Sequence, residues 1–408
     1  MKMKSKYAKR IIIIAICILL MISLQGKVFA AGNCAFSVGA KYNDLNTEPE
    51  TLKALAYYRQ MGYNSYYTTE PTFDELNGYF KIGTRRLESD ILFFSGHGFD
   101  DGSGMVFPNT AVWTRPTSQS TKAVGIDDFN WNTTKLVIYG GCVTALPNNS
   151  NHISIATYRK GAKTVLGWHQ SLDPDSHRDW LNRFNAKLVE GASFSSAFNY
   201  ASSFSYSDPR VNDLGIYGDW NMTYKQSRSG STLENPNTIK ISNEIEFNQK
   251  NQNIMGIIQE IRSINPNFNE DDYKVEIFTL NKEAEFYNIE FEREIDGYKT
   301  ELGYHVCVNN GKVVSITNND KNIITGRSGM DKLTSQEEEK CLEEARRNAI
   351  EDAKKGKLGE VFKKQVEVIK QVPSYYYDVN TGNKYYRVFS TVKNEDGAVD
   401  VATYKKEI

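Results

Sequence analysis

Short apolar runs alternate with stretches of helical periodicity in the first half of the chain. The apolar runs lie at 35–38, 63–68, 90–94, 135–139 and 164–167. Between and after them, apolar positions recur at helical spacing over 49–61, 72–82, 153–160, 176–189 and 193–202. Short buried strands that alternate with helices are typical of a mostly parallel sheet covered by helices on both faces. The pattern therefore predicts an α/β domain at 33–225.

The pattern changes after residue 225. The polar, turn-rich segment 226–240 predicts a linker. A helical periodicity over 242–264 follows, and then alternating strands at 273–278, 285–292, 299–308 and 312–317, with Asp296-Gly297 and Asn310-Gly311 as hairpin turn signals. A charged helix at 335–355 and strands at 362–371, 384–392 and 398–404 repeat this order. We expect two related α+β units, at 241–325 and 330–408.

The N-terminus has the pattern of an export signal. A lysine- and arginine-rich start precedes an apolar run of 14 residues at 11–24, and Val28-Phe29-Ala30 supplies small residues near a cleavage point. That run is the length of a signal core and short for a membrane span. The segment 1–30 is therefore predicted to be a signal peptide, and the protein to be secreted or associated with the cell envelope. The alternative is an uncleaved anchor, which would be its one contact with the membrane.

Composition and charge narrow the class of protein. The 408 residues, 40% hydrophobic and 24% charged, suit a globular protein of two or three domains. Removing 1–30 takes away six Lys or Arg and no acid, which leaves 43 basic against 50 acidic residues and a formal net charge of −7. A mildly acidic exported protein is a poor candidate for binding nucleic acid.

Cysteine usage does not indicate a disulfide framework. Beyond Cys17 in the leader, the chain has Cys34, Cys142, Cys307 and Cys341. Four thiols in so long a chain are too few for a disulfide scaffold. Any pairing among Cys34, Cys307 and Cys341 stays open at this point.

Two of the apolar strands run into residues that carry chemistry. His97-Gly98 follows the strand at 90–94, and Cys142 follows the strand at 135–139. The carboxyl ends of parallel strands meet at one sheet edge, and neighbouring strands lie about 5 Å apart, so the two side chains could meet there. The 45 residues from His97 to Cys142 leave room for a loop and a crossover helix.

A cysteine beside a histidine is a recognisable nucleophilic arrangement. A thiol is only partly ionised at neutral pH, and a nearby imidazole can accept its proton or stabilise the thiolate. Gly98, which has no Cβ, would let the backbone come close to a substrate carbonyl. The backbone N–H groups of Gly98 and Cys142 could then hold an oxyanion. Gly140 and Gly141 would let the chain turn sharply before Cys142.

The strand ending in His-Gly, followed by a strand ending in Cys, resembles the caspase, gingipain and legumain group of cysteine peptidases. The segments 154–168, 179–180, 191–193 and 197–201 resemble its CHAT branch in particular. The resemblance implies a caspase-like three-layer α/β sandwich, with His97 as base, Cys142 as nucleophile, peptide or protein substrates, and no metal or other cofactor. One departure concerns Gly140, because relatives that cleave after Arg or Lys carry an acid there.

Polar residues after the strand at 164–167 should border the same edge. His169, Asp173 and Asp175 are candidates for substrate binding, and the two carboxylates could favour a basic substrate side chain. The alternative for this segment is helix capping by Asp175 or Ser176 before the helix at 176–189.

The C-terminal units resemble PepSY-like domains around 297–316, and such domains accompany exported peptidases. The sequence as a whole predicts an exported cysteine endopeptidase that works through a thioester acyl-enzyme. The alternative is a binding or regulatory protein that keeps the fold without thiol reactivity. Either is compatible with an intramolecular contact in which the C-terminal region covers the active-site cleft.

Overall fold

The structure is a computed structural model. It describes residues 33–42, 45–224, 238–239, 241, 244–247, 254–281, 285–320, 332–355, 365–379 and 381–408. The predicted signal peptide and nearly all of the predicted linker lie outside these residues. Within the described part of the chain, no helix combines the length and the apolar character that a membrane crossing needs.

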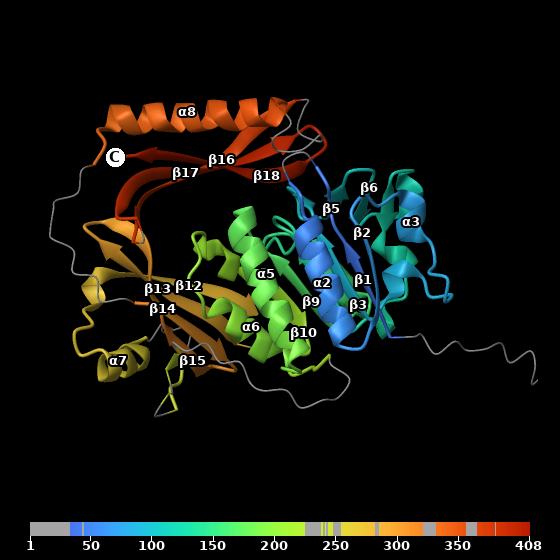
Figure 1. Ribbon diagram of the computed structural model, residues 1–408, viewed down its shortest axis with the longest axis horizontal. Coiled ribbons are helices and arrows are strands. Elements are labelled where there is room, and N and C mark those ends of the chain that lie inside the picture. Colours follow the sequence, from blue (N-terminus) through green and yellow to red (C-terminus); the bar gives the residue numbers. More distant parts are fainter. Residues whose placement is uncertain are drawn as a thin grey trace, which may run out of the picture.

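A six-stranded sheet forms the centre of the N-terminal region (Figure 1). Its order is β10-β9-β8-β3-β1-β2, and every neighbouring pair is parallel except β10 with β9. The apolar runs therefore form the mostly parallel sheet that they predict. The strands are β1 (Cys34–Val38), β2 (Asn64–Thr68), β3 (Ile91–Ser95), β8 (Leu136–Gly140), β9 (Thr164–Trp168) and β10 (Leu214–Gly218).

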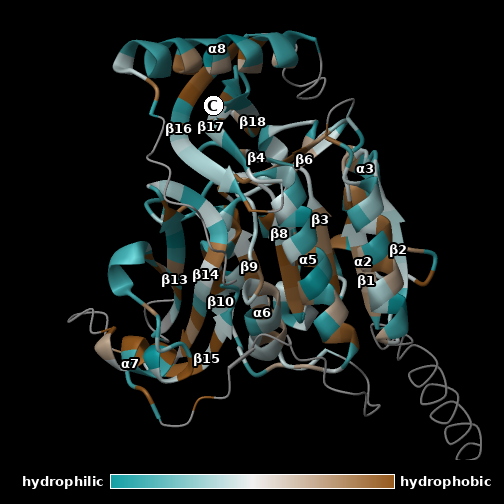
Figure 2. Cartoon of the chain, turned by 60° about the vertical axis from the view of Figure 1, so that its left-hand side comes forward, coloured by the Kyte–Doolittle hydropathy of each residue, from teal (hydrophilic) through white to brown (hydrophobic). Residues whose placement is uncertain are grey.

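Each face of this sheet has its own core. On one face, α2 (Glu48–Gln60), α5 (Pro174–Val189) and α6 (Phe194–Ser202) pack over the strands. On the other, α3 (Phe73–Asn77) and α4 (Ile153–Arg159) cover a second apolar cluster. Burial on both faces explains why the central strands are continuous apolar runs, which are brown in Figure 2.

Two predictions for this region were wrong. The helix expected at 72–82 ends at Asn77, because Gly78 adopts an extended backbone and caps it. The connection from His97 to Cys142 contains no α-helix. It folds instead into short strands, whose few residues have no periodicity to read: β4 (His97–Phe99), β5 (Gly104–Phe107), β6 (Thr110–Trp113) and β7 (Ala123–Gly125).

The C-terminal region follows the predicted order of a helix and then antiparallel strands. Asp296-Gly297 and Asn310-Gly311 all have positive φ, as the predicted hairpin turns require. The helix expected at 242–264 is wrong in its first part, because 244–247 is extended, with Glu246 bridging to Lys312, and the helix begins at Met255. The elements are α7 (Met255–Ile264), β12 (Tyr273–Asn281), β13 (Phe286–Ile295), β14 (Tyr298–Asn309), β15 (Lys312–Asn318), α8 (Ser335–Lys354), β16 (Val366–Asp378), β17 (Asn383–Asn394) and β18 (Ala398–Glu407), with the short β11 (Thr238–Ile239) beside β15.

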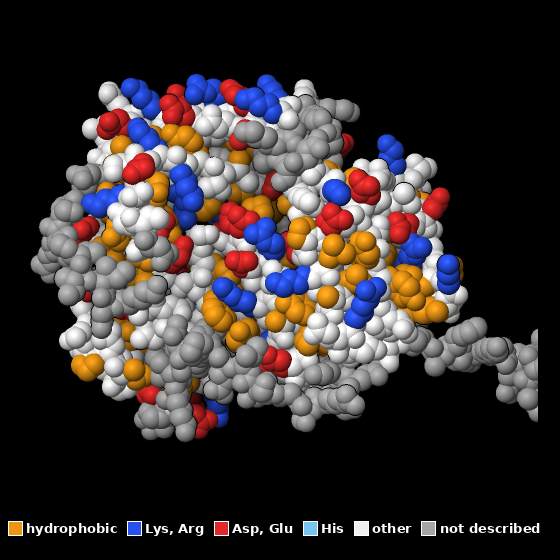
Figure 3. All heavy atoms as spheres, in the orientation of Figure 1, with side chains coloured by type: hydrophobic (Ala, Val, Ile, Leu, Met, Phe, Trp, Pro, Cys, Tyr) orange, Lys and Arg blue, Asp and Glu red, His pale blue; other side chains and the backbone are white. Residues whose placement is uncertain are grey.

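The C-terminal strands continue into the sheet of the N-terminal region. β18 pairs antiparallel with β4, so that one sheet runs from β16 and β17 through β18 into β4, β5, β6 and β7. In Figure 1 the red strands lie beneath α8 and reach the β5 and β6 region. Charged side chains of both signs cover the outer side of α8 at the top of Figure 3. The last strand of the chain thus lies directly beside His97.

Trp180 of α5 is a sensitive point of the first core. It is fully buried, stacks on Phe184 at 5.2 Å between ring centroids and meets Trp168 edge-on at 5.6 Å. We expect Trp180→Ala to lower the free energy of unfolding by about 3–5 kcal/mol, because it leaves a cavity that the sheet cannot close. Urea unfolding followed by intrinsic fluorescence measures this. The control, Tyr79→Ala at a site 61% exposed, should change it by less than about 0.5 kcal/mol. Equal effects would contradict the prediction.

Candidate active site

The two strand ends that carry His97 and Cys142 lie side by side. β3 and β8 are parallel neighbours with Ser95 in register opposite Gly140, and the Gly96 amide donates a hydrogen bond to the Gly140 carbonyl at 3.2 Å. His97 and Cys142 follow these ends and line one cavity of about 130 Å³. A base and a thiol from different strands therefore share one small space.

Gly98 is required by contact with the other strand end. A Cβ on Gly98 would lie 1.9 Å from the Cys142 carbonyl oxygen, so a larger residue would push the two backbones apart. This is a different reason from the approach to a substrate. Val143, directly after Cys142, has a φ of 52°, which is rare for a β-branched residue. Strained backbone of this kind clusters at functional sites.

Strand β18 covers the edge of β4. Val399 is in register opposite Gly98, and the Asp100 amide donates to the Gly397 carbonyl at 2.8 Å. Alternate residues of a strand direct their N–H groups to the same edge, so the Gly98 amide faces Val399. The backbone of Val399 also hydrogen-bonds the His97 ring. A backbone segment of the C-terminal region therefore lies against both Gly98 and His97.

Asp400 is brought into the cavity by the same strand. Its Oδ2 lies 3.6 Å from Nδ1 of His97, and its side chain lines the cavity with His97 and Cys142. The ring of Tyr42 packs on the His97 ring at 4.9 Å between centroids. His97 is only 1% exposed as a result. No sequence motif marked Asp400, because it is far from the other site residues along the chain.

Burial keeps the thiol and the imidazole uncharged in this arrangement. Burial lowers the pKa of His97 to about 3, although the hydrogen bond to Val399 opposes it. Burial, and then the charge of Asp400, raise the pKa of Cys142 to about 12, against smaller lowering by hydrogen bonds to Leu172 and Ser171. A neutral thiol beside a neutral imidazole is not the nucleophilic form. His97 is thus closed to water and Cys142 is partly exposed, and both side chains are uncharged as they stand.

Glu50 is a second carboxylate in the cavity that sequence reasoning missed. It lies in the first turn of α2 and its Oε1 accepts a hydrogen bond from the Ser95 hydroxyl. Burial raises the pKa of Glu50 to about 7, as it does for Asp400. A signal for Glu50 did exist in the sequence. Ala54 and Tyr58 follow Glu50 by four and eight residues, so the helical period places Glu50 on the face of α2 that packs on the core.

The three predicted substrate-binding residues are separated by the structure. Asp175 lines the cavity and pairs with Arg178 at 2.7 Å. Asp173 caps α5 by accepting from the Ser176 amide, so the capping residue is Asp173 rather than Asp175 or Ser176. Nδ1 of His169 lies 2.8 Å from Asp213, and neither His169 nor Asp173 is among the residues that line the cavity.

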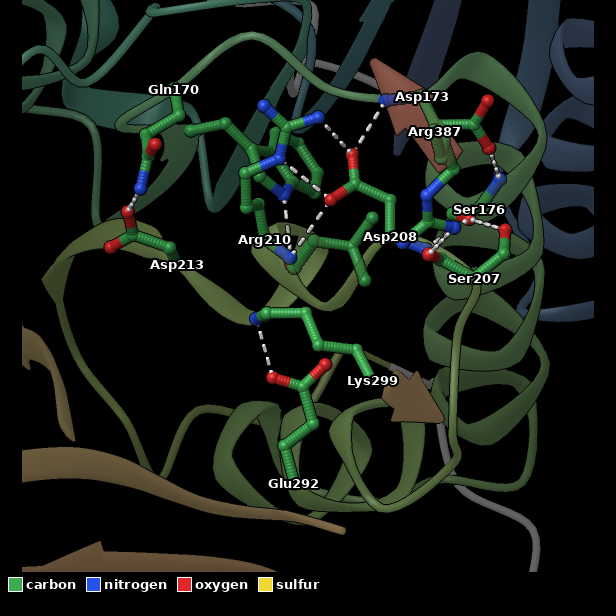
Figure 4. Close-up of polar contacts among 12 residues, drawn as sticks. Gln170, Asp173, Ser176, Ser207, Asp208, Arg210, Asp213, Glu292, Lys299 and Arg387 are labelled. Carbon is green, nitrogen blue, oxygen red and sulfur yellow. Dashed lines mark hydrogen bonds and ion pairs between the residues drawn. The ribbon is translucent and has the colours of Figure 1, made fainter. Parts of the chain in front are cut away.

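The C-terminal region is also anchored away from β18. The Arg387 guanidinium of β17 donates to the Ser207 carbonyl at 2.8 Å, beside the Asp208–Arg210 pair that holds the Asp173 amide (Figure 4). Asn212 donates to Glu290 of β13 at 2.8 Å. These contacts position the sheet that presents β18.

Glu290 is itself part of a buried cluster on the C-terminal sheet. Its Oε1 lies 2.6 Å from Nδ1 of His305, whose Nε2 lies 3.1 Å from the Cys307 sulfur. Burial opposes charge on His305, but Glu290 and Cys307 outweigh it and raise the pKa of His305 to about 10.

Among the described residues, Cys34, Cys142, Cys307 and Cys341 are all free thiols. No group of three His, Cys, Asp or Glu side chains in the described chain is placed to hold a metal ion.

Comparison with known proteins finds likeness to solved structures but no match in sequence. No family model matches the chain, and no curated protein is similar to it. Among solved structures, a crystal structure of the Arg-specific cysteine proteinase gingipain R is similar over 91% of this chain, with 10% sequence identity and a TM-score of 0.30. The chain spans 66% of the length of that proteinase, slightly less than two thirds.

Proposed function

We propose that this protein is an exported cysteine endopeptidase with a caspase-like catalytic domain at 33–225. The observation that supports this best is that His97 and Cys142 leave adjacent parallel strands and line the same cavity. The strained turn at Val143 is typical of a functional site.

In the proposed reaction Cys142 acts as the nucleophile and His97 as the base. His97 takes the thiol proton, the Cys142 sulfur bonds to the substrate carbonyl carbon, and the amides of Gly98 and Cys142 hold the oxyanion. The C–N bond then breaks as His97 returns the proton to the leaving amine, which leaves a thioester. Water, deprotonated by His97, hydrolyses the thioester and restores the thiol.

We further propose that β18 keeps this peptidase latent. Three groups needed for the reaction are covered by one strand: the Gly98 amide faces Val399, His97 bonds to Val399, and Asp400 lies at the dyad. Displacement of β18 would admit water and lower the penalty on a charged imidazole and thiolate. The strand would have to leave before a substrate could bind, which would explain why the resting dyad is uncharged.

A thiol-directed peptide electrophile tests the catalytic proposal. We expect a peptidyl chloromethyl ketone to modify Cys142 of the purified protein, and His97→Ala to slow this by at least about 100-fold, because the base no longer activates the thiol. Intact-mass analysis of the protein gives the rate. Cys142→Ala and Cys307→Ala are matched controls, which should abolish modification and leave it unchanged, respectively. Modification of Cys142 at one rate with and without His97 would favour the binding-protein alternative.

Weakening the β18–β4 pairing should open the site. Val399 directs its N–H toward β4, so Val399→Pro removes that donor, whose net worth is about 1 kcal/mol, and should raise the rate of Cys142 modification by about fivefold or more. Val399→Thr keeps the N–H and the side-chain shape but buries a hydroxyl, so it should raise the rate less than Val399→Pro does. The latency proposal is wrong if Val399→Pro, folded by circular dichroism, shows no increase.

The role of Asp400 can be tested through the pH dependence of the pairing between β18 and β4. Burial raises the pKa of Asp400 from 3.8 to about 7 in the closed form. Ionisation of Asp400 therefore weakens the pairing of β18 with β4 as pH rises through that range. Burial lowers the pKa of His97 from 6.5 to about 3. Protonation of His97 therefore weakens the pairing of β18 with β4 as pH falls through that range. Among the other groups that line the cavity, Cys142 titrates above this range, and the groups that act on the pKa of Glu50 besides burial, which are Ser95, Arg178 and Asp175, all lie outside β18.

The two effects oppose each other between about pH 4 and 6.5. Hydrogen-exchange protection of the β18 amides, corrected for intrinsic rates, should therefore change little over this range in the wild type. In Asp400→Asn the effect of His97 protonation is no longer opposed by that of Asp400. The hydrogen-exchange protection of the β18 amides should therefore fall by up to about tenfold per pH unit below 6.5. Parallel pH profiles in the two proteins would contradict the assignment.

A further inference from the structure

We propose that the cavity beside Cys142 binds the substrate side chain on the amino side of the cleaved bond, that it selects a basic side chain, and that Glu50 determines this selection. The inference rests on the proposed function, since it assigns the substrate class of the same site.

The size of the cavity fits a single side chain. Its volume of about 130 Å³ is well below the roughly 300–1,000 Å³ of small-molecule sites. It extends from Cys142 and Gly140 at the end of β8 to Glu50 on α2 and His177 on α5. A substrate residue whose carbonyl carbon meets the Cys142 sulfur would therefore direct its side chain toward Glu50.

Gly140 keeps this space open. A Cβ at position 140 would lie 2.8 Å from the Phe94 carbonyl oxygen and 3.3 Å from the ring of His177. An acidic side chain at this position, as in the basic-specific relatives named above, does not fit here. The acid comes from α2 instead, at a different wall of the cavity, which accounts for the departure seen in the sequence.

Arg178 favours the charged form of Glu50 but is itself paired with Asp175. Glu50 is 7% exposed, and within the part of the chain that the structure describes it forms no ion pair, its one hydrogen bond being that from Ser95. Arg178 is held by Asp175 at the exposed rim, where Asp175 is 77% exposed. A buried carboxylate without a partner is costly, and a cation brought by a substrate would remove that cost.

A second buried polar group points to the same ligand. Nε2 of His177, which lines the cavity, has no hydrogen-bond partner in the described chain, and burial lowers the pKa of His177 to about 3, so the neutral ring can accept a hydrogen bond. Glu50 and His177 together offer acceptors to the donors of a guanidinium or ammonium group. An acidic side chain would find Arg178, the cation that lines the cavity, already paired with Asp175. The raised pKa values of Asp400 and Glu50 also show that burial in this cavity disfavours a negative charge.

Asp175 and Glu50 have different parts in this arrangement. The predicted acidic wall is present only at the rim, where Asp175 neutralises Arg178. Asp400 belongs to the strand that must leave, so its carboxylate leaves with it. Glu50 stays on α2 in the open form and is the one unpaired acid that a substrate side chain would meet.

The test compares peptidyl chloromethyl ketones that differ only in the residue next to the ketone: Arg, Lys, norleucine or Asp. The full-length protein, in the wild-type and Val399→Pro forms, is modified at Cys142, and rates are read by intact mass. We expect the Arg and Lys compounds to react at least about 100-fold faster than norleucine. Glu50→Gln should remove most of this preference, measured as the ratio of the Arg rate to the norleucine rate of the same variant.

The matched control is Glu48→Gln, two residues away on the same helix, where the partly exposed Glu48 pairs with Lys41. It should keep the full preference. Glu50→Asp, which keeps the charge but shortens the side chain, should lie between the wild type and Glu50→Gln. If neither Glu50 variant folds, the ranking of the four compounds on the wild type still decides the class of side chain.

The other outcomes separate the two proposals. Equal rates for all four compounds, with Cys142 still dependent on His97, would overturn the inference and leave the peptidase proposal standing. A preference for Asp would overturn it in favour of recognition by Arg178. Modification by iodoacetamide but by none of the peptidyl compounds, in the Val399→Pro form as well, would refute the proposed function and the inference with it.

Discussion

The pairing of β18 with β4 is the interaction on which the state of the candidate site depends. It extends over only two residue pairs, yet it joins the C-terminal sheet to the strands that follow His97. Without it, β4 would be an unpaired sheet edge next to the dyad, and an exposed edge is a template for any extended peptide. In this chain the peptide that fills the edge is its own last strand.

The strength of this pairing is consistent with reversible closure. Backbone hydrogen bonds contribute about 1 kcal/mol each, and the Asp100–Lys393 pair at 3.1 Å adds little because solvent screens it. The contacts of Arg387 with Ser207 and of Asn212 with Glu290 hold the rest of the C-terminal sheet separately. β18 also pairs with β17 over nine residues, so exposure of the β4 edge requires β18 either to separate from β17 or to move together with it.

Water exclusion explains the electrostatics of the cavity as a whole. Burial shifts the pKa of the Cys142 thiol, the His97 imidazole and the Asp400 and Glu50 carboxyl groups toward the neutral form of each. The same low polarity that silences Cys142 and His97 makes Glu50 a strong attractor for a cation. Closure of the site and selection of its substrate side chain thus have one physical origin.

The sequence by itself determined the elements that local patterns encode. Continuous apolar runs mark strands buried on both faces, glycine turn signals mark the hairpins, and the strand ends carrying His97 and Cys142 were placed at one edge because parallel strands require it. The short strands β4, β5, β6 and β7 escaped prediction because three or four residues show no period.

Only the tertiary structure decided the contacts between segments that no local pattern links. Asp400 reaches His97 through the pairing of the last strand, and Glu50 reaches the cavity through the packing of α2 on the sheet. Long-range contacts of this kind depend on how whole elements dock, which periodicity and turn chemistry do not specify.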